Sequence, residues 1–423
     1  MREPIGVIGA GWVGLVTAAC FAKLGHEVWA RDIVSEKVES LARGELPIYE
    51  PGLEELLKEH GGRLHFTTEI GEVLEAAELL FCCVDTPATY SGDADLSRVE
   101  TVISEIGDSD RHALVMKSTV PVGTGRTIER RLASIAYVSN PEFLQEGSAV
   151  EDFLHPDRVV IGAVEGASGY ADRVAALYEP LGAPVVRTDV ASAEMVKLAS
   201  NAFLATKISF INEIANVSEE HGADVAEVAA GMGLDERIGP HFLRAGAGWG
   251  GSCFGKDVSS LKQIAGNSGY HFQLLTSVIE VNELQKRRTI GKLQKHLGPL
   301  VGKEIVLLGA AFKPNTDDMR DATSLILAGR LQGEGAHVRV YDPVASERAR
   351  ELMPAAQICS SALEALDGAD GAVLVTEWPE FAELDWAGEI KQAMATPLIV
   401  DGRNFLDREA LREGGFTYEG IGR

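Results

Sequence analysis

A cysteine in a glycine-rich segment is the residue of this chain best suited to covalent chemistry. Cys253 lies in the segment 250–257, after two glycines and shortly before Lys256 and Asp257. Glycine lets a bulky ligand approach the backbone, and a nearby cation favours the thiolate, a good nucleophile toward an aldehyde. Most cysteines in soluble proteins are small buried hydrophobes. That interpretation suits the other four, Cys20, Cys82, Cys83 and Cys359. Cys253 lies outside any apolar run, so we interpret it as functional.

A glycine turn near the N-terminus is the second chemical signature. Gly9, Gly11 and Gly14 follow a strand-like run and precede an apolar helical stretch, with Trp12 and Val13 between them. Such glycines allow a tight turn and bring a pyrophosphate close to a helix N-terminus. Asp32 ends the next strand-like run, where a carboxylate binds ribose hydroxyls and repels a 2′-phosphate. The pattern predicts a dinucleotide site that prefers NAD, and adjacent Arg31 keeps some use of NADP open.

Three polar features could contribute to catalysis, each with a plain structural alternative. Lys197 and Asn201 lie four residues apart and share a face of a predicted helix. They could aim a cation and an amide at an oxyanion, or simply face solvent. Glu142 and Glu146 could act as acid and base, or favour a helix N-terminus. Thr119 follows a strand, where ligands of open α/β sheets bind.

Composition excludes several classes of partner. The 423 residues carry a formal net charge of −24, which disfavours nucleic acid and anionic membranes. No run approaches about 18 uncharged apolar residues, so we expect no membrane span. Five scattered cysteines match neither a disulfide framework nor a metal cluster, so we expect no metal and a cytoplasmic location. Anionic ligands would need local cations. Candidates, which could equally be surface charges, are Arg237, Arg244, Lys256, Lys313, Arg320 and Arg403.

Apolar runs predict an α/β protein with a helical middle. Unbroken apolar runs are typical of parallel strands buried on both faces, and helical patterns between them predict doubly wound sheets. Residues 192–220 form one helical stretch without Gly or Pro. We predict two Rossmann-like doubly wound domains, at 1–190 and 299–423, joined by an all-helical domain at 191–298 with a long helix and the Cys253 loop. Predicted strands are 5–8, 27–31, 79–84, 113–117, 137–139, 158–163, 304–308, 338–341, 372–375 and 398–400.

Together these motifs resemble the nucleotide-sugar 6-dehydrogenases, the UDP-glucose/GDP-mannose dehydrogenase family. The resemblance runs nearly from end to end, and the motifs keep their order. Beyond the glycine turn they are Cys-Val-Asp-Thr-Pro (83–87), Tyr-Ser-Gly-Asp-Ala-Asp-Leu (90–96), Lys-Ser-Thr-Val-Pro-Val-Gly-Thr (117–124), Asn-Pro-Glu-Phe-Leu (140–144), Glu-Asp-Phe-Leu-His-Pro-Asp-Arg (151–158), Lys-Leu-Ala-Ser-Asn-Ala-Phe-Leu-Ala (197–205), Gly-Gly-Ser-Cys-Phe (250–254), Ala-Phe-Lys-Pro-Asn-Thr-Asp-Asp (311–318) and Asp-Gly-Arg (401–403).

The resemblance implies two successive oxidations at C6 of UDP-glucose. Each would reduce one NAD, and the product would be UDP-glucuronate, used in polysaccharide biosynthesis. Cys253 matches the nucleophile, which holds the aldehyde as a thiohemiacetal and then the acid as a thioester. Lys197 matches the residue that aids alcohol deprotonation and steadies the oxyanion, and Asn201 matches a donor beside it. Glu142 matches the base for thioester hydrolysis. Residues that match water-positioning groups are Thr119 and Asp257.

The same family pattern implies contacts with both ligands. Cofactor contacts would be Gly9, Gly11, Trp12, Val13, Gly14, Asp32, Lys37, Thr86, Thr119, Glu146, Lys256 and Arg320. UDP-sugar contacts would be Glu142, Phe143, Leu144, Glu146, Lys197, Asn201, Arg237, Arg244, Trp249, Gly250, Lys313 and Arg403. The resemblance also implies a homodimer formed through the central helix, with Arg237 supplied to the substrate by the neighbouring subunit.

Few positions depart from the family pattern. Trp12 replaces the usual Tyr, Gln145 a frequent Arg, Trp249 a Phe or Tyr, and Gly255 a Pro or Gln. Two of them flank the nucleophile, so they bear on sugar specificity or rate. The nearest alternative is the same four-electron oxidation of UDP-N-acetylhexosamine or GDP-mannose. A one-step 3-hydroxyacid-type dehydrogenase would make the cysteine dispensable, and a non-enzymatic NAD-binding scaffold would leave the matched catalytic residues without a role.

Overall fold

Two structural units make up the chain in this computed structural model, which describes residues 2–89, 92–132, 134–164 and 166–423. The first unit is Met1–Ser200 with Ser259–Tyr270, and the second is Asn201–Val258 with His271–Arg423. Tyr90 and Ser91 of the motif at 90–96 lie outside the described residues.

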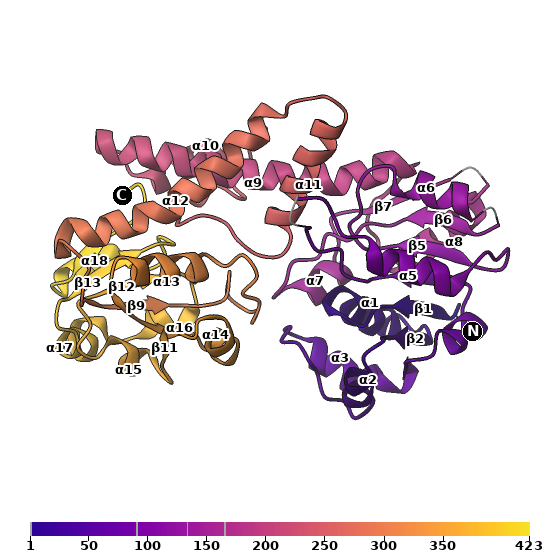
Figure 1. Cartoon of the computed structure of the whole chain (residues 1–423), viewed down its shortest axis with the longest axis horizontal. Helices are drawn as coiled ribbons and strands as arrows, with labels where there is room; N and C mark the ends of the chain where they lie inside the picture. The colour runs from indigo at the N-terminus through magenta and orange to yellow at the C-terminus, as the bar shows by residue number, and fades with distance from the viewer. Residues whose placement is uncertain (1, 90–91, 133, 165) are drawn as a thin grey trace. The chain divides into compact units, whose positions relative to one another are not determined.

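The first unit contains a sheet in the order β3-β2-β1-β4-β5-β6-β7-β8 (Figure 1). Helices α1, α3, α7 and α8 pack on one face, and α4, α5 and α6 pack on the other. The strands are β1 (Ile5–Ile8), β2 (Val28–Arg31), β3 (Leu64–Thr67), β4 (Leu79–Cys82), β5 (Ala113–Met116), β6 (Ala136–Ser139), β7 (Val159–Ala163) and β8 (Val185–Asp189). The helices are α1 (Trp12–Lys23), α2 (Ser35–Ala42), α3 (Leu53–His60), α4 (Ile70–Ala76), α5 (Ser97–Ile106), α6 (Thr124–Arg131), α7 (Ala149–Leu154) and α8 (Ser168–Tyr178).

The predicted strands of this unit form, with small shifts at their ends. Central strands β1, β4 and β5 are buried along their whole length, as unbroken apolar runs require. Parallel pairing fails at one place, because β7 runs antiparallel to β6. Strands β3 and β8 were not predicted. They lie at the two edges of the sheet, where short, partly exposed segments carry no apolar run.

The second unit contains a smaller parallel sheet in the order β11-β10-β9-β12-β13-β14. Side chains on one face pack against α12, α13 and α14, and those on the other against α15, α16 and α18. The strands are β9 (Glu304–Leu308), β10 (His337–Tyr341), β11 (Gln357–Ile358), β12 (Gly371–Leu374), β13 (Leu398–Asp401) and β14 (Thr417–Glu419). The helices are α13 (Thr323–Gly333), α14 (Ser346–Leu352), α15 (Ala362–Leu366), α16 (Pro379–Glu383), α17 (Lys391–Ala393) and α18 (Arg408–Glu413).

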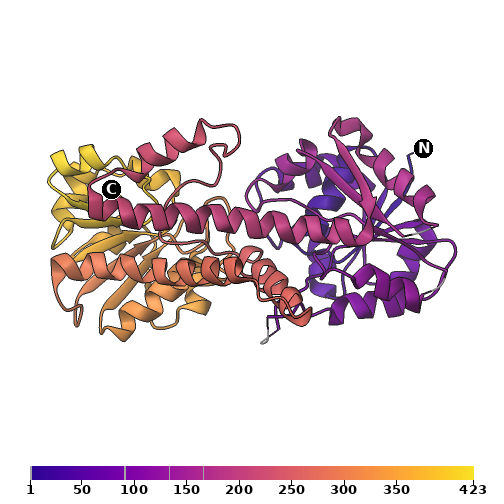
Figure 2. The ribbon, with the colours of Figure 1, turned by 90° about the horizontal axis from the view of Figure 1, so that it is seen from above.

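The middle of the chain is helical, as predicted. Its elements are α9 (Val190–His221), α10 (Val225–Gly233), α11 (Phe254–Asn267) and α12 (Gln273–Leu297). Helix α9 is unbroken (Figure 2) and ends before Gly222, whose φ of 74° stops a helix. In the second unit α9 lies beside α12, where the Ser209 hydroxyl donates to the Val278 carbonyl at 3.0 Å. The predicted fold class, two Rossmann-like α/β regions and a helical middle, is confirmed.

Among the described residues, no helix is long and apolar enough to cross a membrane.

Candidate active site

The glycine turn of the first unit is shaped for a dinucleotide. Gly9 has a φ of 98°, and a Cβ on Gly14 would lie 1.8 Å from the Gly9 carbonyl oxygen. Neither position accepts a side chain without moving the turn. A Cβ on Gly11 would meet only Asp85 Oδ1, at 3.8 Å. The space beside Gly11 is therefore open at the N-terminus of α1, where a pyrophosphate binds in this type of turn. These residues fit NAD.

Asp32 ends β2 beside this turn. Its carboxylate accepts hydrogen bonds from the Ala10 N–H at 3.0 Å, the Val34 N–H at 3.1 Å and the Lys37 ammonium at 2.9 Å. The Arg31 guanidinium is held elsewhere. It pairs with Glu105 at 2.8 Å, on α5, and donates to the Thr68 carbonyl. Arg31 is therefore engaged and does not offset the charge of Asp32, which favours NAD over NADP.

Two predicted cofactor contacts follow neighbouring parallel strands. Thr86 comes after β4 and Thr119 after β5, and the Thr86 hydroxyl donates to the Thr119 carbonyl at 2.7 Å. Carboxyl ends of parallel strands meet at the same edge of a sheet, where ligands bind. Glu146 is buried in the same unit. The predicted residues are thus held in place, and their cofactor contacts stay predictions.

Lys197 and Glu142 form a buried ion pair in the first unit. The Lys197 ammonium lies 2.8 Å from Glu142 Oε1, and both residues are less than 10% exposed. Burial raises the pKa of the Glu142 carboxyl, but the ion pair with Lys197 and the Leu144 N–H outweigh it and lower the pKa. The Phe143 ring is close to two cations, with the Arg158 guanidinium 3.8 Å from its centre and the Lys197 ammonium 5.5 Å away. The Glu142–Lys197 pair can therefore hold a proton on the carboxylate and stabilise an anionic oxygen through the ammonium.

Cys253 belongs to the second unit and immediately precedes α11. Its carbonyl accepts a hydrogen bond from the Asp257 N–H at 2.8 Å, the first bond of that helix. Its thiol lies 3.6 Å from the Ser252 hydroxyl. A helix N-terminus favours negative charge, and a thiolate is the reactive form of cysteine. Of the five cysteines, all of which the structure describes, only Cys253 is not buried.

Asn201 and Asp257 meet in the second unit. The Asn201 side-chain amide donates to Asp257 Oδ2 at 2.6 Å, and Lys256 pairs with Asp257 Oδ1 at 2.8 Å. Asp257 is 1% exposed, so these two partners hold its side chain away from solvent. Lys197 and Asn201 are neighbours on α9, yet each pairs with a different carboxylate. The two side chains share a helix face, as their spacing predicts, but they belong to two different polar networks.

The loop before Cys253 is fixed from two sides. Asn282 of α12 exchanges two hydrogen bonds with the Trp249 backbone, at 2.7 and 3.0 Å. The Trp249 indole donates to the Ser209 hydroxyl at 3.1 Å. A Cβ on Gly250 would lie 2.3 Å from the Asp321 carbonyl oxygen. Glycine is needed there because two backbone segments touch.

The basic residues predicted to hold the UDP-sugar differ in how they are placed. Arg403 is anchored, donating to the carbonyls of Gly248 at 3.0 Å and Val375 at 2.6 Å. Arg244 is exposed, with its guanidinium 5.8 Å from the Phe405 ring. The remaining basic residues predicted as ligand contacts are Lys313, 5.6 Å from the Phe312 ring centre, Arg320, paired with Asp318 at 2.7 Å, and Arg237, whose side chain is 88% exposed and pairs with Asp235.

Several buried polar residues near the predicted site were missed from the sequence. Lys117 donates to Asn140 and Tyr178 within the first unit. Glu50 accepts from the Trp12 indole at 2.9 Å and from two backbone N–H groups at the start of α7, so it ties the glycine turn to the loop that bears Glu146. A charged residue directly after a buried strand is the signal that could have identified Lys117.

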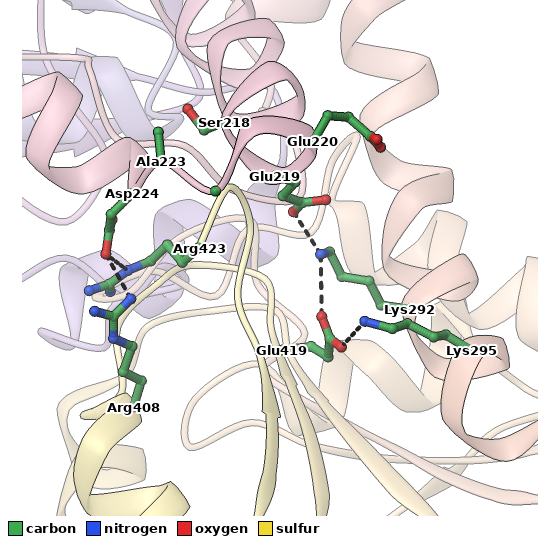
Figure 3. A pocket seen from close by; sticks show the side chains of 11 residues that line it. Ser218, Glu219, Glu220, Ala223, Asp224, Lys292, Lys295, Arg408, Glu419 and Arg423 are labelled. Atoms are coloured by element: carbon green, nitrogen blue, oxygen red, sulfur yellow. Dashed lines mark hydrogen bonds and ion pairs between the residues drawn. The ribbon is translucent and has the colours of Figure 1, made fainter.

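A separate cavity of about 470 Å³ lies in the second unit. Figure 3 shows that ion pairs line it, with Lys292 between Glu219 and Glu419, and Asp224 facing two arginines. Those arginines are Arg408 of α18 and Arg423 at the end of the chain. None of the predicted site residues lines this cavity.

Comparison with known proteins agrees with this geometry. Three models of the UDP-glucose/GDP-mannose dehydrogenase family match the chain in order: the NAD binding domain at 3–182, the central domain at 191–284 and the UDP binding domain at 306–408. The chain is 43% identical to UDP-glucose 6-dehydrogenase TuaD of Bacillus subtilis, over 100% of this chain and 93% of that protein. It is 45% identical to UDP-glucose 6-dehydrogenase of Pseudomonas aeruginosa, over 99% and 97%.

Solved structures of similar proteins show the same fold. A UDP-glucose dehydrogenase from Pyrobaculum islandicum has a TM-score of 0.92 and 39% identity, covering 100% of this chain and 98% of that one. A UDP-D-ManNAc dehydrogenase from Pyrococcus horikoshii has a TM-score of 0.86 and 28% identity, covering 100% and 99%. Full-length identity above 40%, the three ordered domains and a turn that fits NAD together establish that this chain belongs to the UDP-glucose/GDP-mannose dehydrogenase family of NAD-dependent oxidoreductases.

Proposed function

We propose that this enzyme oxidises C6 of UDP-glucose twice to give UDP-glucuronate, reducing two NAD and consuming one water. The observation that carries the proposal is Cys253, the one cysteine that is not buried, at the start of a helix in a glycine loop. A thiol in that setting can hold an aldehyde between two oxidations. The relatives that match along their full length are named UDP-glucose 6-dehydrogenases.

The first half of the reaction makes an aldehyde and captures it. The glycine turn would hold NAD, which would supply the hydride acceptor for each oxidation. As the C6 hydroxyl loses its proton to water, the Lys197 ammonium steadies the resulting oxyanion, a role suited to a buried cation. The Cys253 thiolate then adds to the aldehyde carbon, forming a C–S bond. Asn201, whose side-chain amide donates to Asp257, is proposed as the hydrogen-bond donor beside Lys197 in that step.

The second half releases the acid. After the second oxidation the C6 carbon is a thioester of Cys253. Glu142 removes a proton from water, the water oxygen bonds to C6, and the C–S bond breaks to return the thiolate. The low pKa of Glu142 keeps it ionised, as a base must be. Thr119 and Asp257 are proposed to position the water.

The domain assignment follows the same reasoning. We propose that residues 1–190 bind NAD, that residues 191–298 carry the Cys253 loop, and that residues 299–423 bind the UDP-sugar through Lys313 and Arg403. Arg244, from the 191–298 domain, is proposed to contact the same ligand. The five cysteines are free in the structure, as a reducing compartment leaves them, and we propose a cytoplasmic location.

A second copy of the chain is proposed to cover α9. Phe203, Phe210 and Val217 are each about half exposed or more, at 66%, 48% and 56%. They recur every seven residues and so share one face of the helix. Apolar side chains gathered on one helix face mark an interaction surface. A homodimer through α9 would leave Arg237 available to the partner's substrate. Sedimentation of the double variant F203E/F210E should then give a monomer, whereas the wild type should sediment as a dimer.

Counting NADH tests the reaction. With limiting UDP-glucose, the wild type should release two NADH per sugar, whereas a one-step dehydrogenase would release one. UDP-N-acetylhexosamine and GDP-mannose are run in parallel, and a higher kcat/KM for either would reassign the substrate. Cys253→Ser should lose turnover by orders of magnitude, as expected for loss of a nucleophile. Cys20→Ser is the matched control, because that thiol is buried in α1. Normal turnover in Cys253→Ser would exclude the covalent route.

Glu142→Gln separates the two halves. It should give a burst of NADH and then slow turnover, with a sugar–nucleotide adduct on Cys253 in the intact mass. Absence of both burst and adduct would move the base role to another residue.

A further inference from the structure

Lys117 is a buried cation to which the mechanism above gives no role. It directly follows β5 and is 4% exposed. Within the described residues, no carboxylate lies within 4 Å of its ammonium, which donates instead to Asn140 Oδ1 at 3.3 Å and the Tyr178 hydroxyl at 3.2 Å. Its charge also lies 5.5 Å from the Tyr178 ring centre and 5.9 Å from that of Phe153. Burying an ammonium without a direct counter-ion is costly, so its retention calls for a reason.

Hydrogen bonding does not supply that reason. The Tyr178 hydroxyl donates to Asn140 Oδ1 at 2.8 Å, and the Asn140 amide donates to the Val160 carbonyl at 2.9 Å. Both partners therefore keep a hydrogen bond without Lys117. An apolar side chain of similar size would leave no buried polar group unpaired, and such replacements are often neutral or stabilising. A structural role would be served equally well by methionine.

Lys117 lies beside the segment that bears Glu142, because its ammonium donates to Asn140, two residues before Glu142, and all three side chains are buried. Charge links Lys117 to the Glu142–Lys197 pair as well. Burial lowers the pKa of Lys117 to about 8, against the opposing effects of Cys83 and Glu142. Lys197 lowers it further, as a like charge does. The charge of Lys117 in turn helps to lower the pKa of Glu142. The charged or titratable groups around Lys117 and Glu142 are Cys20, Cys83, Tyr178 and Lys197, and the Leu144 N–H donates a hydrogen bond to Glu142.

We propose that Lys117 is a positioning residue that keeps Glu142 ionised while Lys197 is engaged with the substrate oxygen. This inference rests on the proposed function. When an oxyanion forms at C6, the Lys197 ammonium pairs with it. Lys197 then stabilises the Glu142 carboxylate less. The Lys117 ammonium is held by Asn140 and Tyr178, so its charge stays near Glu142 throughout the reaction. The carboxylate is therefore ready to take a proton from water when the thioester forms.

Two variants remove the charge in different ways. Lys117→Met removes charge and hydrogen bonds, whereas Lys117→Gln keeps an amide donor for Asn140 and Tyr178. Without the cation, Glu142 binds its proton at higher pH, so the acid limb of thioester hydrolysis should move up by about one pH unit, on the order expected for one nearby charge. Tyr178→Phe is the control, because it removes a hydrogen bond from Lys117 and leaves the charge in place. Its acid limb should stay where the wild type has it.

The measurement is the pH dependence of two rates in the same preparation. Rapid mixing gives the NADH burst, and steady-state turnover gives hydrolysis, with the Cys253 adduct followed by intact mass. At low pH, Lys117→Met and Lys117→Gln should accumulate more adduct than the wild type. A wild-type acid limb in both would overturn the inference, and so would an equal shift in Tyr178→Phe, which would assign the effect to hydrogen bonding.

Failure of this inference is distinguishable from failure of the proposed function. If the wild type releases one NADH per sugar and shows no adduct, the two-step mechanism is wrong. If the wild type releases two NADH, and both Lys117 variants keep its pH profile, only the role of Lys117 is wrong. Thermal unfolding should show Lys117→Met at least as stable as the wild type, because it removes a buried unpaired charge.

Discussion

The two α/β sheets of this chain begin in the same way and differ from their first loop onward. Strand β1 is followed by Gly9, with a φ of 98°, and strand β9 is followed by Gly309, with a φ of 99°. A Cβ on Gly9 would lie 3.0 Å from the Cys83 backbone, and one on Gly309 would lie 2.3 Å from Thr376. Both clashes are with the end of the neighbouring strand. The turn that ends the first strand is thus a property of the fold and not of the cofactor.

The next residues decide what each sheet can bind. In the first unit α1 starts at Trp12, and Gly14 packs onto the turn. In the second unit α13 starts only at Thr323, and a loop carrying Lys313 and Arg320 lies between. A short glycine turn presents backbone N–H groups to a pyrophosphate, whereas a long loop presents side chains. One fold therefore supports two kinds of ligand site.

Asp32 and Asp342 occupy equivalent positions, at the ends of the second strands. Asp342 is 1% exposed and accepts from the N–H groups of Ala310, Ala311, Val344 and Ala345 and from the Trp378 indole. Asp32 accepts from two N–H groups and from Lys37, which is partly exposed. A carboxylate saturated by buried donors is structural, and one bonded to a partly exposed ammonium can exchange that partner for a ribose.

The largest expected effect is on the stability of the second sheet. Asp342→Ala would leave five donors, four of them buried, without their acceptor. It should cost about 3–5 kcal/mol, the range for breaking a buried charged network. Asp32→Ala should cost clearly less, because it frees fewer fixed donors beside an open turn. Urea unfolding of both variants measures the difference. Equal losses in the free energy of unfolding would show that the two carboxylates have the same structural role.

The glycine turn offers a sharper contrast within the first sheet. Gly11→Ala should fold normally, because its Cβ meets nothing closer than 3.8 Å, and yet raise the KM for NAD at least about tenfold by filling the space for a pyrophosphate. Gly14→Ala should lose stability as well, because its Cβ would overlap the Gly9 carbonyl. Thermal unfolding and NAD titration separate the two. Wild-type NAD affinity in Gly11→Ala would place the pyrophosphate elsewhere.

Cofactor choice should respond to Asp32 more modestly. The wild type should prefer NAD, because a 2′-phosphate would meet the carboxylate at close range, and Asp32→Ala should narrow the ratio of kcat/KM for NAD over NADP. Arg31→Ala is the matched control and should leave the ratio unchanged, because Arg31 is held by Glu105. Equal use of both cofactors by the wild type would mean that Asp32 does not contact the ribose.

The smallest effect concerns the charges that tie β14 to α12. Burial raises the pKa of Glu419, but Lys295, His296 and Lys292 outweigh it and lower the pKa. A lowered folded pKa means that the stabilisation is present above the ordinary glutamate value of about 4.3 and is lost as the pH falls through the folded value.

Glu419→Gln should therefore destabilise by less than about 1 kcal/mol at pH 7, since solvent screens part of the cluster. Its difference from the wild type should vanish at low pH. Glu45→Gln, which breaks the exposed Arg43–Glu45 pair of the first unit, should show no measurable change. A loss for Glu419→Gln that does not depend on pH would point to packing instead of charge.

Local pattern predicted most of the architecture. Buried strands such as β1 and β9 were found to the residue, because an apolar run reports burial on both faces directly. Edge strands β3, β8, β11 and β14 were missed, because they are partly exposed, carry no apolar run and pair according to the neighbouring strand. The antiparallel pairing of β6 and β7 was also missed, because the residues of a strand do not indicate the direction in which it pairs.

The chain's own residues determined the glycine turn, the long helix without Gly or Pro, and the one cysteine outside an apolar run, because these depend on backbone freedom and local periodicity. The tertiary structure decided the partners. Lys197 pairs with a carboxylate 55 residues away and Asn201 with one 56 residues away, although the two are neighbours on α9. Lys117 became visible only as a buried ammonium beside that pair. Charge pairing and burial depend on contacts between distant segments, and spacing along the chain does not contain them.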